Sequence, residues 1–263
     1  MIETARTLLF VPGDRPDRFG KAAAAGADVV VLDLEDAVSP AAKTTARGHV
    51  LAWLAAGNTA VVRVNATGTR WHAEDVAAVR DHAAAIMVPK AERVADLAGL
   101  PAVVALVETA AGIAAARELC ATPNVVRAAF GSIDLAAELG VDPTSRTALL
   151  HARSALVLAA AAAGCAPPVD GVTTALTDAD AVRDDVAHAR ELGFTGKLCV
   201  HPRQIHPVHE ALRPSEDELR WARAVVAAAA ADGSAVAVEG KLVDRPVLLR
   251  AQRLLAADSD RTD

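Results

Sequence analysis

Two carboxylates in this sequence come shortly after apolar runs that are typical of buried strands. Glu108 follows the run at 103–107, and Asp134 follows the run at 125–130. Because function in parallel sheets collects at the carboxyl ends of the strands, we expect both acids at one mouth of the fold. Two carboxylates with room for water and substrate oxygens suit Mg²⁺. The alternative is that each acid caps the helix after it, where the helix dipole favours negative charge.

A second group of charged residues also stands at predicted strand ends. Arg63 ends an apolar strand, where an unpaired guanidinium would be costly. Its partner is therefore an acid, Glu35 or Asp36, or a substrate carboxylate that its forked donors bind. Both can hold, because an acid partner would orient the arginine. Asp33 and Glu35 are expected to point to one side and Asp36 to the other.

The elements that must position these groups alternate regularly along the chain. Helices are expected between most of the strands, which argues for parallel pairing. Eight such units favour closure into a TIM (β/α)8 barrel. A doubly wound sheet is the alternative, but the first turn, VPGDRPDRFG, has no GxGxxG spacing. The predicted strands cover residues 7–12, 28–32, 59–64, 85–88, 103–107, 125–130, 168–172 and 197–200.

Residues beyond the eighth unit form a predicted helical extension. Helices are expected at 216–231 and 245–257, with a short strand-like piece at 235–238. We therefore divide the chain into a barrel at 1–212 and an extension at 213–263. Within the extension, LVDRP reads as an exposed turn in which Asp244 caps the last helix.

Composition excludes several classes of function for the 263 residues. Aromatic residues make up only 3%, with no Tyr, so a base-stacking nucleic-acid surface is not expected. A formal net charge of −6 gives no general attraction to nucleic acid or to an anionic membrane. No apolar run is long enough to span a bilayer, and we see no signal peptide. Three cysteines without a CxxC pair indicate a reducing, cytoplasmic location, with each cysteine filling space in the core.

At this point the sequence resembles a known family over nearly its whole length. It is similar to the citrate lyase beta-subunit-like proteins of the HpcH/HpaI aldolase/citrate lyase family. That resemblance implies a Mg²⁺-dependent TIM barrel that cleaves or forms a carbon–carbon bond in a 3-hydroxyacyl-CoA, such as a citryl, malyl, citramalyl or hydroxymethylglutaryl thioester. The matching stretches, in order, are RTLLFVPGDRPDRFGKA, VVVLDLEDAVSPAAKTTAR, VVRVNATGTRW, IMVPKAE, LVETAAG, FGSIDL, GFTGKLCVHPRQI and GKLVDRPVLLRAQ.

The resemblance also implies roles for the acids and the arginine. Glu108 and Asp134 would bind the metal, and Arg63 would hold the oxoacid end of the substrate. Glu35 and Asp36 match the LEDAV signature and would hold metal-bound waters and Arg63.

Further roles follow from the same resemblance. Asp244 would act as the acid/base at the thioester α-carbon, and the extension would cover the active site of a neighbouring subunit in a homotrimer or hexamer. Phe10 and Lys21 would contact the coenzyme A thioester, although Phe10 also suits core packing. His201 and Pro202 would shape the mouth near the substrate.

Three other readings of the function stay open at the level of the sequence. A metal-dependent pyruvate-type aldolase on free oxoacids would share the barrel and the metal pair. A citrate lyase beta subunit would act on an acyl-carrier-protein thioester, which makes that carrier an alternative partner. A barrel kept as a non-catalytic scaffold is the third, and the complete set of Glu108, Asp134 and Arg63 argues against it. Net hydrolysis of the thioester also occurs in this family.

Overall fold

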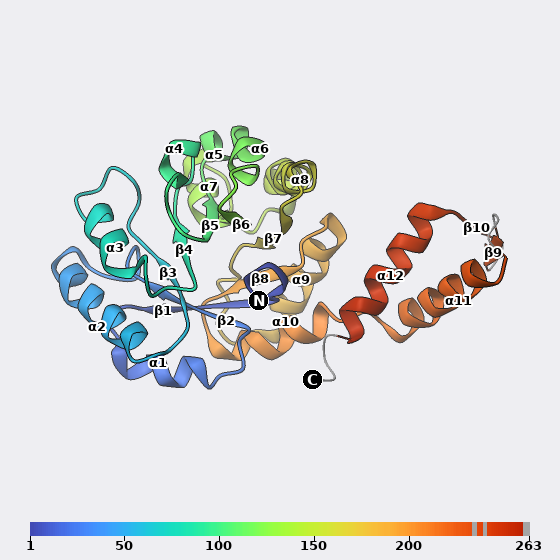
Figure 1. The fold of residues 1–263 in the computed structure, drawn as a ribbon, viewed down its shortest axis with the longest axis horizontal. Helices are drawn as coiled ribbons and strands as arrows, with labels where there is room; N and C mark the ends of the chain where they lie inside the picture. Colours follow the sequence, from blue (N-terminus) through green and yellow to red (C-terminus); the bar gives the residue numbers. More distant parts are fainter. Residues whose placement is uncertain (233–235, 239–240, 260–263) are drawn as a thin grey trace. The chain divides into compact units, whose positions relative to one another are not determined.

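Eight parallel strands close into a barrel in the computed structural model, which describes residues 1–232, 236–238 and 241–259 (Figure 1). The first strand pairs with both the second and the eighth, so the sheet has no free edge. The predicted TIM barrel is therefore confirmed, and the doubly wound alternative is wrong. The strands are β1 (Thr7–Pro12), β2 (Val29–Asp33), β3 (Val61–Arg63), β4 (Ala85–Val88), β5 (Val103–Val107), β6 (Val125–Phe130), β7 (Ala166–Asp170) and β8 (Gly196–Cys199).

Helices follow most strands and cover the outside of the barrel (Figure 1). Two segments differ from the sequence-based expectation. The helix after β5 is broken into two short pieces, and the expected turn after β6 is the start of a helix that carries Asp134. The helices are α1 (Pro16–Ala23), α2 (Lys43–Ala55), α3 (His72–Val79), α4 (Val94–Leu97), α5 (Ala110–Ala114), α6 (Ala116–Cys120), α7 (Ser132–Leu139), α8 (Arg146–Ala163), α9 (Ala179–Leu192) and α10 (Ile205–Ala211).

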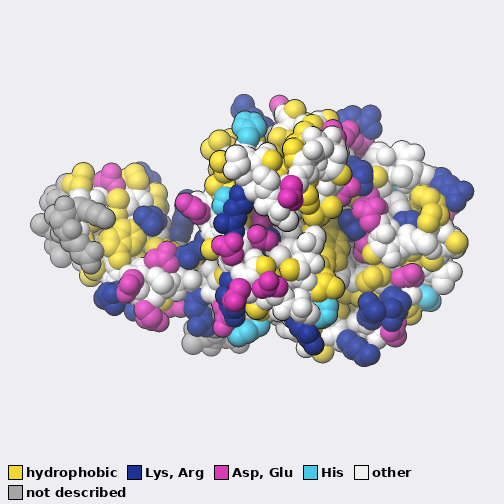
Figure 2. All heavy atoms as spheres, turned by 180° about the vertical axis from the view of Figure 1, so that it is seen from behind, with side chains coloured by type: hydrophobic (Ala, Val, Ile, Leu, Met, Phe, Trp, Pro, Cys, Tyr) yellow, Lys and Arg dark blue, Asp and Glu magenta, His cyan; other side chains and the backbone are white. Residues whose placement is uncertain are grey.

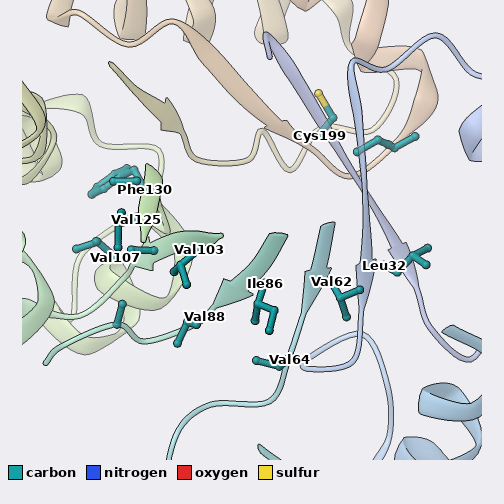
Figure 3. Packing of buried hydrophobic residues seen from close by; sticks show 14 of the residues in the cluster. Leu32, Val62, Val64, Ile86, Val88, Val103, Val107, Val125, Phe130 and Cys199 are labelled. Atoms are coloured by element: carbon teal, nitrogen blue, oxygen red, sulfur yellow. The ribbon is translucent and has the colours of Figure 1, made fainter. Parts of the chain in front are cut away.

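Alternate residues of each strand face two different apolar layers. On β2, Val31 packs inside the barrel and Leu32 packs outward against the helices; Val61 and Val62 do the same on β3. Figure 3 shows part of the outer layer, including Leu32. The three cysteines are free, and two of them are fully buried in this layer, as expected for core residues.

A single arginine fills the amino-terminal end of the barrel. The Arg127 side chain is completely buried and donates to the backbone oxygens of Ile2, Ala5 and Pro167 and to Thr195 Oγ1. The N-terminal segment, β6, β7 and the residue before β8 thus meet at one guanidinium. Burial without a carboxylate partner lowers the pKa of Arg127 to about 10.

The chain divides into two compact units, Met1–Leu212 and Arg213–Asp263. The second contains α11 (Glu216–Asp232), a two-stranded antiparallel sheet of β9 (Val236–Val238) and β10 (Lys241–Val243), and α12 (Arg245–Ser259). It has its own small core, formed by Ala222, Val225, Val243 and Ala251. The sequence did not predict β10, and residue 235 of the expected strand lies outside the described residues.

Two surface properties of the described residues complete the description. None of their helices has the length and apolar content needed to cross a bilayer. On the face in Figure 2, Lys and Arg side chains are interspersed with Asp and Glu.

Candidate functional site

Register between β2 and β3 brings the first charged pair together at the carboxyl ends of the strands. Asp33 lies directly opposite Arg63. The Arg63 Nε and Nη2 atoms donate to the two Asp33 carboxylate oxygens at 2.8 and 2.7 Å. The main partner is therefore Asp33 rather than the expected Glu35 or Asp36. The remaining Arg63 nitrogen, Nη1, lies 3.1 Å from Glu35 Oε2 and 3.7 Å from Asp36 Oδ2.

Arg63 is held on a third side by an aromatic ring. Its guanidinium carbon lies 4.8 Å from the centroid of the half-buried Phe10 ring, which packs on top of the interior layer of the barrel. Burial disfavours the charged form, but the Asp33 and Glu35 carboxylates outweigh it and raise the pKa of Arg63. Arg63 therefore stays charged and has one orientation before any substrate arrives.

Glu108 is placed by the turn after β5 and is almost completely buried. Its Oε1 atom accepts the backbone N–H of Lys90 at 3.0 Å. On its other side lies Gly131, where a Cβ atom would come within 2.3 Å of Glu108 Cβ and 2.4 Å of Oε2. A glycine at 131 is therefore what allows the Glu108 carboxylate to pack against the backbone between β6 and α7.

Asp134 lies in the first turn of α7, with its side chain 37% exposed, so it faces the open side of the same group. Burial first, and then the Glu35 and Asp134 charges, raise the pKa of Glu108 to about 8. The raised pKa indicates that Arg63 and Lys90 do not fully offset the negative charge of the acids. The cluster therefore favours an added cation.

Lys90 joins these acids, although it was not among the residues predicted from the sequence. Its Nζ atom lies 2.7 Å from Glu35 Oε1, 3.6 Å from Asp134 Oδ1 and 3.8 Å from Glu108 Oε1. The signal that could have found it is its place in the turn after β4, equivalent to that of Glu108 after β5. Through Lys90 and Glu35, the structure brings Glu108, Asp134 and Arg63 to one mouth of the barrel.

The donor set fits a hard divalent cation. Glu108 and Asp134 offer carboxylate oxygens, which Mg²⁺ prefers, and Mg²⁺ usually keeps several waters beside one or two carboxylates. Across the described residues, no group of three or more His, Cys, Asp or Glu side chains is arranged to hold a metal. Glu108 and Asp134 thus match the one or two carboxylates that Mg²⁺ usually takes from a protein.

The other predicted residues of the barrel are mostly exposed. Asp36 is exposed, apart from its 3.7 Å approach to Arg63. His201 caps its own turn, because its Nδ1 atom accepts the Arg203 N–H at 3.2 Å, and Pro202 is exposed. Lys21 is exposed in the last turn of α1.

Asp244 belongs to the second unit. Its Oδ1 atom accepts the backbone N–H of Val247 at 3.1 Å, so it caps α12 as the sequence predicts. Its side chain is exposed.

A cavity of about 330 Å³ lies on the other side of α7. At its wall, Asp170 pairs with Arg153 at 2.9 Å and with Lys197 at 2.9 Å, and all three side chains are buried. Ser132 at the start of α7 also lines it. Asp170 at the end of β7 thus joins α8, which carries Arg153, to β8, which carries Lys197.

The fold and the site together define a TIM-barrel protein whose strand ends hold a cluster of acids, a fixed arginine and a lysine. Comparison with known proteins gives the family. A profile of HpcH/HpaI aldolase/citrate lyase matches residues 6–102 and 98–202. The chain belongs to the HpcH/HpaI aldolase/citrate lyase family, and the predicted resemblance is confirmed.

Similar proteins span the full length of the chain. A citrate lyase subunit beta-like protein of Mycobacterium tuberculosis is 41% identical over 97% of this chain and 96% of its own. The crystal structure of protein CitE from that organism, in complex with magnesium, acetoacetate and coenzyme A, superimposes with a TM-score of 0.87 at 40% identity, covering 98% and 99% of the two chains. A (3S)-malyl-CoA thioesterase of Cereibacter sphaeroides is 34% identical over 95% of this chain and 93% of its own.

Proposed function

We propose that this protein is a Mg²⁺-dependent carbon–carbon lyase that cleaves a 3-hydroxyacyl-CoA into an acyl-CoA and an oxoacid. The observation that carries the proposal is the meeting of Glu108, Asp134 and Arg63 at one mouth of the barrel, with Lys90 between the two acids and Glu35. The similar CitE structure, which contains magnesium, acetoacetate and coenzyme A, supports the choice of ligands.

Glu108 and Asp134 hold the metal in this proposal. When bound, Mg²⁺ supplies Lewis-acid stabilisation of the oxoacid oxygens. Arg63 binds the oxoacid carboxylate through Nη1, which it shares with Glu35 at 3.1 Å, since Asp33 already occupies its Nε and Nη2 atoms. Asp33 thus fixes the guanidinium in place, so little side-chain entropy is lost when substrate binds.

Bond cleavage needs a proton to leave the 3-hydroxyl group and another to reach the acyl-CoA carbon. A base accepts the hydroxyl proton as the bond between C2 and C3 breaks. The electron pair of that bond passes to the acyl-CoA enolate, and Asp244 protonates it at the α-carbon. Asp244 acts on the site of a neighbouring subunit in a homotrimer or hexamer, covered by residues 213–263.

The coenzyme A arm lies along the rim in this proposal. Lys21, exposed on α1, pairs with its phosphate groups, and Phe10 contacts the thioester end from its place over Arg63. His201 and Pro202 shape the mouth at the end of β8. Asp36 holds Arg63 and the metal-bound waters from the outer side.

A direct test combines metal binding with a substrate screen. Citryl-, malyl-, citramalyl- and hydroxymethylglutaryl-CoA are each incubated with the protein and Mg²⁺, and the products are separated. We expect one to yield an acyl-CoA and an oxoacid. Glu108→Ala and Asp134→Ala should abolish turnover and Mg²⁺ binding, while the exposed Glu118→Ala should not. Normal cleavage by either site variant with unchanged Mg²⁺ binding would refute the metal assignment.

Asp244 is tested separately by Asp244→Asn, which preserves helix capping because Asn caps as well as Asp does. We expect α-proton exchange of the acyl-CoA with solvent to be lost while oxoacid binding persists. Retained exchange would remove Asp244 from the mechanism.

Thioester hydrolysis is the second candidate, favoured by the 34% identity to the malyl-CoA thioesterase. The same screen separates the reactions, because hydrolysis releases free coenzyme A and an intact hydroxy acid. Activity on free oxoacids would instead support a pyruvate-type aldolase. Activity on an acyl-carrier-protein thioester would support a citrate lyase beta subunit.

A further inference from the structure

Lys90 occupies a backbone conformation that its residue type rarely adopts. Among the described residues it is the one non-glycine with a positive φ, at 49°. A side chain in this left-handed region is strained, and such strain persists only where surrounding contacts impose it. Here the backbone N–H of Lys90 donates to Glu108 while its ammonium group reaches Glu35. Lys90 therefore contacts the acid cluster through both its main chain and its side chain.

The ammonium of Lys90 is the cation nearest to the proposed metal ligands. Arg63 cannot replace it, because two of its three nitrogens are taken by Asp33. Lys90 Nζ hydrogen-bonds to Glu35 at 2.7 Å, but at 3.6 and 3.8 Å it only approaches Asp134 and Glu108. The ammonium group thus makes one hydrogen bond, to Glu35, and two longer ion-pair contacts, to Asp134 and Glu108.

We propose that Lys90 is a built-in counterion that holds the metal site together when no divalent cation is bound and keeps only its contact with Glu35 when one binds. The inference deepens the proposed function and rests on its assignment of Glu108 and Asp134 as ligands. An ammonium group and a dication within 4 Å of the same oxygens repel each other strongly. The hydrogen bond to Glu35 keeps the Lys90 ammonium group in place after its contacts with Glu108 and Asp134 are lost.

Glu35 is suited to this role by its own surroundings. It is 6% exposed, its Oε1 atom accepts from Lys90, and its Oε2 atom lies 3.1 Å from Arg63 Nη1. Glu35 therefore pairs with both cations, through a hydrogen bond from Lys90 and an ion-pair contact with Arg63. Lys90 is therefore a positioning residue that sets how tightly the metal binds, through charge rather than ligation.

The test compares Mg²⁺ binding to the full chain and to three variants by titration calorimetry at pH 8.5. Lys90→Met removes the charge, Lys90→Arg keeps a cation, and Arg93→Met removes a nearby exposed charge that pairs with Asp96. We expect the dissociation constant of Lys90→Met to fall about tenfold, because a repelling charge is gone. The other two variants should stay within about threefold of the unchanged protein.

Equal or weaker Mg²⁺ binding by Lys90→Met would overturn the inference. Failure of the unchanged protein to bind Mg²⁺ would instead overturn the proposed function, so the two failures are distinguishable.

A measurement on the unchanged protein covers the case in which Lys90→Met does not fold. Acetylation of the five lysines is followed by mass spectrometry with and without Mg²⁺. We expect Lys90 to react several-fold faster with Mg²⁺, since it loses two of its three acid contacts. The exposed Lys21 and the buried Lys197 serve as internal references that stay constant. An unchanged Lys90 rate, with Mg²⁺ bound, would also overturn the inference.

Discussion

The Glu108 carboxyl group keeps its proton to an unusually high pH when no cation is bound. Burial and the neighbouring acids raise its pKa to about 8, against an ordinary 4.5. A raised pKa means that the folded state holds the proton more tightly than the unfolded state between these values. Stability is therefore fully present below about 4.5 and is lost as the pH rises toward 8.

The first prediction concerns this pH window. In the presence of a chelator, we expect the free energy of unfolding to decrease between pH 5 and 8, by about 1.4 kcal/mol for each pH unit at most. Glu108→Gln should flatten the slope, while the exposed Glu118→Gln should leave it. Denaturant unfolding at a series of pH values checks this, and a slope unaffected by Glu108→Gln would contradict it.

Metal affinity gives a second prediction at the same residue. Glu108 must lose its proton to bind Mg²⁺, so binding should strengthen by up to about tenfold per pH unit below pH 8 and level off above it. Calorimetry in buffers of different ionisation enthalpy measures the released proton. Binding that does not change between pH 6 and 8 would contradict the release of a proton from Glu108 on metal binding.

At the residue scale, the sequence shows which side chains end the strands but not which of them touch. Asp33 and Arg63 pair because they are opposite in the register of β2 and β3, and register is set by the whole barrel. The sequence does not predict this position for the Lys90 side chain, because a lysine in a turn usually points to solvent. The three-dimensional structure shows that Lys90 has a left-handed backbone and that its side chain reaches three acids.

At the scale of elements, the junction of β6 and α7 controls the acid cluster. The strands themselves could be predicted, because buried parallel strands give short apolar runs at regular spacing. The start of α7 could not, since Gly131 and Ser132 are typical of a turn. The structure adds the close approach of Gly131 to Glu108, which the sequence does not reveal.

A glycine comparison tests this junction. Gly131→Ala places a Cβ about 2.3 Å from Glu108, so we expect a loss of about 1–3 kcal/mol in stability and at least tenfold weaker Mg²⁺ binding. Gly140→Ala is the matched control, because Gly140 ends the same helix in a left-handed conformation with open space around it. It should cost about 1 kcal/mol and leave Mg²⁺ binding intact. Equal effects of both substitutions on Mg²⁺ binding would contradict the role of Gly131.

The molecule as a whole consists of two units with separate cores. All the acids of the cluster, with Arg63 and Lys90, lie in the first unit, whereas Asp244 lies in the second. In the proposed function, binding and proton transfer therefore belong to different parts of the chain.

Truncation at the boundary gives the prediction at this scale. We expect residues 1–212 alone to unfold cooperatively and to bind Mg²⁺ with the affinity of the full chain, because the cluster needs no residue beyond Leu212. Turnover should be lost with Asp244. Circular dichroism and calorimetry check folding and binding. Loss of Mg²⁺ binding in a folded truncated chain would contradict the division.

The buried guanidinium of Arg127 has a consequence for synthesis on the ribosome. It joins Ile2 and Ala5 to Thr195, partners separated by almost the entire first unit. The barrel therefore cannot close until β8 has been synthesised. Translation from the first residues to β8 takes on the order of 10 s at ordinary rates. During that interval the early strands have unpaired edges, and a nascent-chain chaperone that shields them should raise the yield of folded protein.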